Sequence, residues 1–150
     1  MILRKLLVPI IAIFGIWVPA MGQNVEKFTV KENTYYGTKA IPEEITGLYK
    51  YEKDKEPIVD LKLGGTGYFQ MHGVKPYPIE YWIETDVNGK IQKRTSEINS
   101  NYIVVLIVKY GSNGESGPFG SRAGTYNRID VAMSFDTGFA IVLGERFRQL

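Results

Sequence analysis

Short runs in which apolar and polar residues alternate dominate the chain from Gly47 onward. A two-residue period is the mark of half-buried β-strands, and no long amphipathic helical pattern occurs in this part of the sequence. The alternation predicts eight strands, at about residues 47–52, 57–63, 66–72, 79–86, 90–95, 101–110, 125–135 and 138–148.

Tight turns separate these strands, at Gly64-Gly65, Asn88-Gly89 and Asp136-Thr137-Gly138. Consecutive strands joined by tight turns must pair antiparallel, because parallel pairs need long crossover connections. We therefore predict an all-β domain over residues 47–150, an antiparallel up-and-down barrel or a sandwich of about eight strands.

The Asn88-Gly89 dipeptide is the strongest turn signal in the chain. Asn-Gly between alternating segments favours a two-residue type I′ turn, whose twist matches that of the flanking strands. Such a turn places Val87 opposite Lys90, Thr85 opposite Gln92, and Glu84 opposite Lys93.

The segment from Tyr102 to Tyr110 is apolar on both faces. A strand of this kind must be covered on both sides. A second sheet, an N-terminal arm lying outside a barrel wall, or a partner protein would each provide the second cover. The two sets of side chains are Ile103, Val105 and Ile107 on one face, and Val104, Leu106 and Val108 on the other.

Residues 1–22 have the layout of a cleavable secretion signal. Arg4 and Lys5 precede an uncharged run from Leu6 to Val18, and Ala20-Met21-Gly22 is the predicted cleavage box. We expect an exported protein, periplasmic or extracellular, without a membrane association after cleavage. Residues 23–46 are predicted to form an N-terminal arm, with a short strand from Val25 to Lys31.

The basic charge of the chain belongs to this signal. The sequence has 18 basic and 16 acidic residues, and residues 1–22 contain two of the former and none of the latter, so the rest is 16 − 16 = 0. A neutral domain lacks the positive field that attracts nucleic acid, and we expect no nucleic-acid partner. With no cysteine in the chain, stability must come from packing.

No motif predicts a metal site or a cofactor. His72 is the only histidine and no cysteine accompanies it, so the usual zinc spacings are absent. The serines show no nucleophile-elbow motif. Glu80 and Glu84 flank Trp82 on one strand face, as in sugar-binding clefts, but four extended residues separate them by ~13 Å. Glycosidase carboxylates lie about 5–9.5 Å apart, so we expect no catalysis by this pair.

The glycine-rich segment 111–124 joins two predicted strands and is longer than most hairpin loops. We interpret it as a loop, with a lid or a recognition loop as the alternative. Phe119 and Arg122 would be its contact residues.

Two short features resemble the lipocalin-like (calycin) barrels. Gly47-Leu48-Tyr49 stands where that family has Gly-x-Trp, and Arg146 and Arg148 lie in the last strand, where the family has an arginine over the first strand's ring. The resemblance implies an up-and-down barrel whose first and last strands meet, with Tyr49, Arg146 and Arg148 as its closure.

A barrel of eight strands has room for side chains or for one small ligand. We expect an exported, non-catalytic binding protein for a small apolar ligand; a protein–protein interaction or structural module of the cell envelope without a cavity is the alternative, and a hydrolase is the least supported. A packed core is the competing interpretation of the residues predicted to line the cavity. These are Ile79, Tyr81 and Ile83, then Ile103, Val105 and Ile107, and finally Phe139, Ile141 and Leu143.

Overall fold

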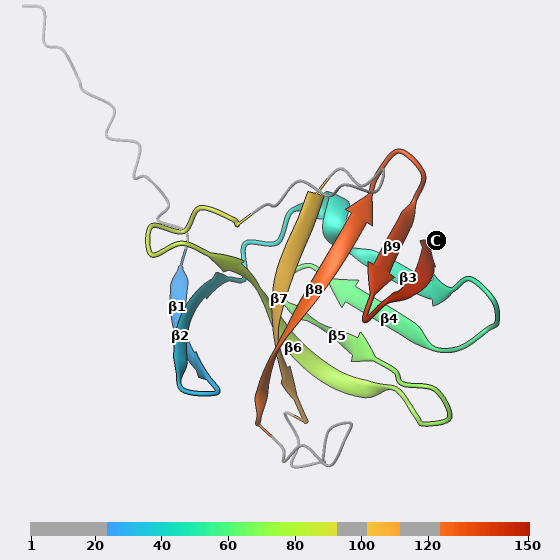
Figure 1. Ribbon diagram of the computed structural model, residues 1–150, viewed down its shortest axis with the longest axis horizontal. Coiled ribbons are helices and arrows are strands. Elements are labelled where there is room, and N and C mark those ends of the chain that lie inside the picture. The colour runs from blue at the N-terminus through green and yellow to red at the C-terminus, as the bar shows by residue number, and fades with distance from the viewer. Residues whose placement is uncertain (1–23, 93–101, 112–123) are drawn as a thin grey trace, which may run out of the picture.

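The computed structural model describes residues 24–92, 102–111 and 124–150 of the protein. Its strands form one antiparallel sheet (Figure 1). The strands are β1 (Val25–Val30), β2 (Asn33–Thr38), β3 (Gly47–Tyr51), β4 (Ile58–Lys62), β5 (Thr66–Phe69), β6 (Tyr77–Thr85), β7 (Tyr102–Tyr110), β8 (Tyr126–Ser134), β9 (Phe139–Val142) and β10 (Glu145–Gln149), and the 3-10 helix η1 (Glu43–Ile45) precedes β3.

The eight strands β3 to β10 close into a barrel in which each strand pairs with the next one along the chain. The last strand returns to the first, where Gln149 lies opposite Tyr49 and Phe147 lies opposite Tyr51. Closure leaves no exposed sheet edge in the barrel wall. The predicted all-β, antiparallel, up-and-down barrel of eight strands is confirmed.

Two of the predicted strands differ from the structure. The segment 138–148 is a hairpin rather than one strand, since Leu143 and Gly144 form a turn with φ of 51° and 80°. An apolar residue at a positive φ is uncommon. Leu143 therefore gave no turn signal in the sequence. In place of the strand predicted at 90–95, Ile91 forms an isolated bridge to Thr85, and residues 93–95 lie outside the described ranges.

The turn at Asn88-Gly89 exists, but its predicted register is wrong by one residue. The Gly89 N–H donates to the Asp86 carbonyl and the Asp86 N–H to the Lys90 carbonyl, so three residues form the loop. The Asp86 carboxylate explains the difference, because it accepts from the N–H groups of Asn88 and Lys90 and stabilises a wider turn. Gly89 alone in this loop has a positive φ, 86°.

We expect Gly89→Val to lower the free energy of unfolding by about 1–3 kcal/mol, because a β-branched residue is strained at positive φ. Urea denaturation followed by circular dichroism measures the loss. Asn88→Val, at a neighbouring position without positive φ, should lose less than half as much. Equal losses would contradict the assignment of the strain to Gly89.

The predicted N-terminal arm contributes two strands to the sheet. The hairpin β1–β2 pairs with β6 through Tyr36 to Thr38 and lies beside the barrel, at the left of Figure 1. It covers the outer face of the wall, where Phe28 packs on Trp82 and Ile107 in a second, smaller hydrophobic cluster. Of the three covers considered for the second face of β7, the arm is the one observed.

The main core fills the barrel. Inward-facing side chains from every barrel strand form one cluster, which Ile41 and Ile45 extend from the segment before β3. The wall is therefore packed against apolar side chains on its inner side, and on its outer side at β6, β7 and β8.

Candidate functional site

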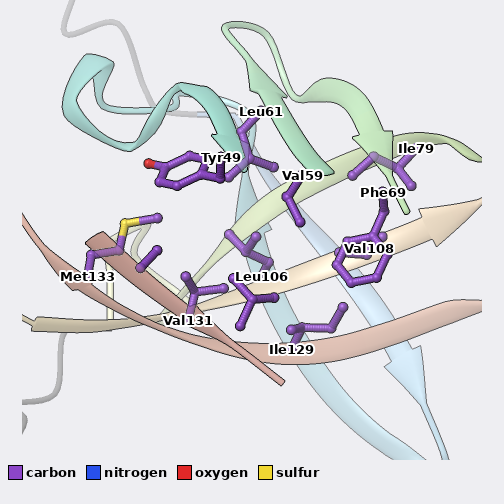
Figure 2. Close-up of a pocket in the computed structure, with 12 residues that line it drawn as sticks. Tyr49, Val59, Leu61, Phe69, Ile79, Leu106, Val108, Ile129, Val131 and Met133 are labelled. Carbon is purple, nitrogen blue, oxygen red and sulfur yellow. The ribbon is translucent and has the colours of Figure 1, made fainter. Parts of the chain in front are cut away.

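The interior of the barrel is filled by side chains rather than by a ligand cavity. Figure 2 shows the inward-facing residues converging from opposite walls, among them Tyr49, Leu106 and Val131. The space left among the lining residues is about 10 Å³, which is roughly the volume that one water molecule requires. Pockets for small ligands are about 300–1,000 Å³, so the packed-core interpretation describes this interior.

Of the predicted lining residues whose side chains the structure describes, only those on β6 take the predicted place in the interior. Ile79, Tyr81 and Ile83 belong to the main core. The Tyr81 hydroxyl donates to the Lys62 carbonyl at 2.7 Å, and burial raises the pKa of its phenol.

The predicted inward face is wrong for β7. Val104, Leu106 and Val108 point into the barrel, whereas Ile107 belongs to the outer cluster under the N-terminal hairpin. Val105 alternates with the inward residues and is also buried on the outer side. The side chain of Ile103 lies outside the described residues. Alternation failed here because both faces of this strand are apolar.

The predicted inward face is also wrong for β9, where Ala140 and Val142 point inward. Phe139 and Ile141 are half-buried on the outside of the wall, and Leu143 is 54% exposed in the β9–β10 turn. Because the turn at Leu143 was not detected, the segment was predicted as one strand. The alternation carried through that single strand assigned the wrong positions of β9 to the inward face.

The barrel closes where the sequence predicted, although the predicted ring contact is not the one formed. Tyr49 lies in the core, and its hydroxyl donates to the Ile45 carbonyl at 2.6 Å. Arg146 and Arg148 instead lie over Phe139, with guanidinium carbons 3.7 and 5.2 Å from the ring centroid. Arg146 also reaches Glu52 at 3.5 Å and so links β10 to the end of β3.

A groove of about 410 Å³ opens at one mouth of the barrel. Three core residues, Phe69, Val142 and Phe147, come from β5, β9 and β10 and form its floor. The rim consists of Pro57, Gln70, Met71, His72, Leu143 and Glu145. The sequence reasoning missed this site except for Leu143, because the mouth is formed by strand ends and turns that are distant in sequence.

One polar pair stands on this rim. The His72 Nε2 lies 2.8 and 2.9 Å from the two Glu145 carboxylate oxygens. The imidazole also meets the Tyr51 ring edge-on at 5.1 Å between centroids. The pair joins the β5–β6 connection to β10 and closes one side of the mouth.

Gln70 holds the wall of the groove in place. Its side-chain carbonyl accepts from the Ile58 N–H at 3.1 Å, and its amide donates to the Val74 carbonyl at 3.0 Å. The side chain is buried, so these bonds fix the β5–β6 connection against β4. The mouth is therefore a preformed feature of the wall.

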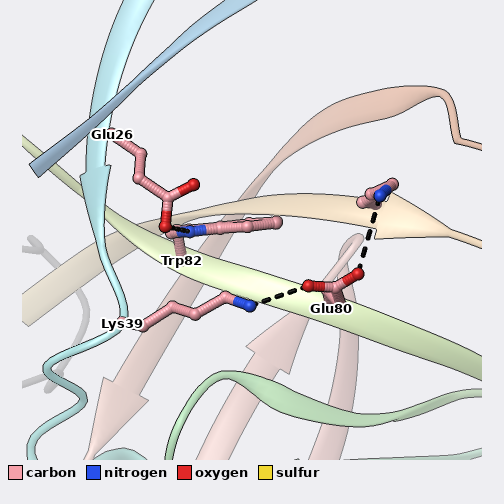
Figure 3. Close-up of polar contacts among 5 residues, drawn as sticks. Glu26, Lys39, Glu80 and Trp82 are labelled. Carbon is pink, nitrogen blue, oxygen red and sulfur yellow. Dashed lines mark hydrogen bonds and ion pairs between the residues drawn. The ribbon is translucent and has the colours of Figure 1, made fainter. Parts of the chain in front are cut away.

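The two carboxylates flanking Trp82 are held in separate ion pairs, and Figure 3 shows that of Glu80 with Lys39. Glu80 lies 2.7 Å from Lys39 and 3.6 Å from Lys109, and the hydrogen bond from Lys39 holds the pKa of Glu80 below its usual value. Glu84 pairs with Arg128 at 2.6 Å, whereas Lys93, its predicted partner, lies outside the described residues. The lowered pKa keeps the Glu80 carboxylate ionised near neutral pH.

Trp82 itself is buried under the N-terminal hairpin. Its indole N–H donates to Glu26 at 2.8 Å, and the Lys39 ammonium lies 4.5 Å from the ring centroid. The indole lies on the outer face of the wall and reports on the hairpin, not on the barrel mouth.

Other chemistry finds little support in the described parts of the chain. No group of three or more metal-binding side chains occurs there. No helix there is long and apolar enough to span a membrane.

Burial raises the pKa of the Tyr110 phenol, beside Phe69, to about 12, so this phenol stays protonated at neutral pH. The loop residues Phe119 and Arg122 lie outside the described ranges.

The fold and the groove together define a closed, up-and-down antiparallel barrel with a packed interior and an apolar groove at one mouth. No model of a known protein family, no curated protein and no solved structure matches the chain.

Proposed function

We propose that the chain is an exported, non-catalytic binding protein that holds a small apolar ligand at the mouth of its barrel. The contrast in volume carries the proposal: about 10 Å³ remain inside the barrel, against about 410 Å³ at the mouth. Export is proposed from the composition of residues 1–22. The strand order is compatible with the lipocalin-like barrels that the sequence resembles.

The lining of the mouth supports an apolar ligand. Its floor is Phe69, Val142 and Phe147, and its volume lies in the range of known ligand sites. The polar rim is small, because Gln70 is occupied by backbone groups and His72 by Glu145. This arrangement supplies an apolar contact surface with a narrow polar edge, and no nucleophile lies beside a base among the described residues that line it.

A second candidate is a protein–protein interaction module of the cell envelope. The observation in its favour is the exposure of Leu143 and Val74, at 54% and 40%, at the same end of the barrel. Exposed apolar side chains around a groove also suit the insertion of a partner's side chain. Small-molecule binding separates the two candidates.

Leu143→Asn tests the mouth. Leu143 has a φ of 51° and precedes Gly144 in the turn, so asparagine there creates the Asn-Gly sequence that type I′ turns favour. We expect a stability gain of about 0.5–1 kcal/mol together with a roughly tenfold loss of ligand affinity, since an apolar wall is removed. Calorimetric titration with fatty acids and retinoids, and urea denaturation, measure the two effects.

Leu63→Asn is the matched control. Leu63 is 61% exposed in the β4–β5 connection at the opposite end of the barrel, so its replacement should leave affinity unchanged. A wild-type protein that binds none of these ligands would contradict the apolar-ligand function. Equal losses in both variants would contradict the placement of the site.

A further inference from the structure

The cations on the barrel strands are paired with carboxylates, with two exceptions. Among the described residues, neither Lys50 on β3 nor Arg148 on β10 has an acidic side chain within 4 Å, whereas the other four cations of these strands do. The four pairs are Lys62 with Asp60 at 3.6 Å, Lys109 with Glu80 at 3.6 Å, Arg128 with Glu84 at 2.6 Å, and Arg146 with Glu52 at 3.5 Å.

The two exceptions lie directly opposite each other. Lys50 and Arg148 are register partners in the β3–β10 pair. Their neighbours Tyr49 and Phe147 point into the core, so both cationic side chains point outward on the same face. Like charges in directly opposite positions destabilise a sheet. A wall that neutralises its other cations thus retains a repulsive pair at the seam where the barrel closes.

Two more lysines join this pair. Lys53 and Lys55, from the β3–β4 connection, line an open groove of about 440 Å³ together with Lys50 and Arg148. The groove also contains two carboxylate side chains, each with a partner of its own. Glu52 is the partner of Arg146, and Asp54 accepts from the Lys55 backbone N–H at 2.6 Å. The groove therefore has four cationic side chains against two carboxylate side chains, and among the described residues none of the four forms an ion pair with either carboxylate.

We propose that this groove binds a multiply charged anionic group of the phosphate type. A guanidinium offers two parallel N–H donors to such a group, and the ammonium groups add point charges around it. Phe139 lies under the Arg148 guanidinium and restricts its orientation. The site is separate from the barrel mouth and does not depend on the function proposed there. A soluble phosphate compound and a phospholipid headgroup would supply the same chemistry.

Titration with sodium pyrophosphate tests the site directly. At about ten times the dissociation constant we expect the melting temperature to rise by about 3–6 °C, and backbone amide resonances of residues 50–55 and 146–148 to shift. Sodium chloride at the same ionic strength is the control, since screening alone must not produce the effect. Sedimentation with phosphatidylglycerol vesicles, against phosphatidylcholine vesicles, distinguishes a headgroup from a soluble ligand.

Lys50→Gln gives the sharpest outcome, because two effects of opposite sign are expected. It should weaken pyrophosphate binding at least about tenfold, while raising the melting temperature of the free protein by about 1–3 °C through relief of the repulsion. Arg148→Gln should also weaken binding. The double variant Lys27→Gln/Lys31→Gln removes two positive charges, twice as many as either single variant, from exposed positions on the N-terminal hairpin and should change neither property.

Three results would overturn the proposal. Neither pyrophosphate nor anionic vesicles bind; binding survives both Lys50→Gln and Arg148→Gln; or the hairpin variant weakens binding equally, which would mean a diffuse charge effect. Because the barrel mouth is untouched, ligand binding there is expected to persist in every one of these variants.

Discussion

Replacing Trp82 with alanine is expected to lower the free energy of unfolding by about 3–5 kcal/mol. The indole is 3% exposed and packs against Phe28 and Tyr126, with centroids 4.8 and 6.0 Å away. Alanine leaves a cavity under the hairpin, orphans the Glu26 carboxylate that accepts from the indole N–H, and removes the ring beneath Lys39. Urea denaturation followed by far-ultraviolet circular dichroism measures the loss.

A second readout locates the effect in the N-terminal hairpin. Limited trypsin digestion should cut faster after Lys39 in the alanine variant, because the hairpin is held to β6 by three residue pairs and by this cluster. Trp82→Phe keeps an aromatic ring but loses the N–H donor, and should cost about 1–2 kcal/mol. An alanine variant that unfolds like the wild type, with unchanged digestion, would show that the hairpin is not packed cooperatively on the wall.

The barrel itself was predictable because turn chemistry and alternation agree along most of the chain. Gly64-Gly65 and Asp136-Thr137-Gly138 lie between strands as expected, and both glycines of the first turn have positive φ, 78° and 76°. Where turn and alternation disagree, the prediction was wrong. The turn at Leu143-Gly144 was missed because leucine is not a typical turn residue. The turn at Asn88-Gly89 is wider than the Asn-Gly dipeptide predicts, because the Asp86 carboxylate accepts hydrogen bonds within it.

The functional residues were less predictable, for a physical reason. Alternation assigns two faces but cannot say which is inward when both are buried, as on β7 between the barrel core and the outer cluster. The groove at the barrel mouth forms where the ends of particular strands meet. The groove that contains Lys50 and Arg148 forms because these two residues are register partners. Lys50 and Arg148 are 98 positions apart (148 − 50) and become neighbours only through barrel closure.

Gly67→Ala is expected to lower the free energy of unfolding by about 3 kcal/mol, the upper end of the usual cost of overpacking. Gly67 lies within β5, opposite Leu61, and a Cβ there would overlap the Asp60 carbonyl oxygen of β4. The obstacle is backbone, which cannot rotate away as a side chain does, so the two strands must separate. Gly67 forms a cluster of glycines with the Gly64-Gly65 turn but lies within the predicted strand 66–72, and its role is to allow the close approach of β4 and β5.

Gly64→Ala is the control that separates the two reasons for glycine in this cluster. Gly64 has a φ of 78° but nothing within 4 Å of the added atom, so only backbone strain opposes alanine there, at about 1–2 kcal/mol. The loss of free energy of unfolding should therefore be larger for Gly67→Ala, where two strands approach closely, than for Gly64→Ala, where the backbone is left-handed. Urea denaturation of both variants decides the order, and the reverse order would mean that the barrel wall widens readily between β4 and β5.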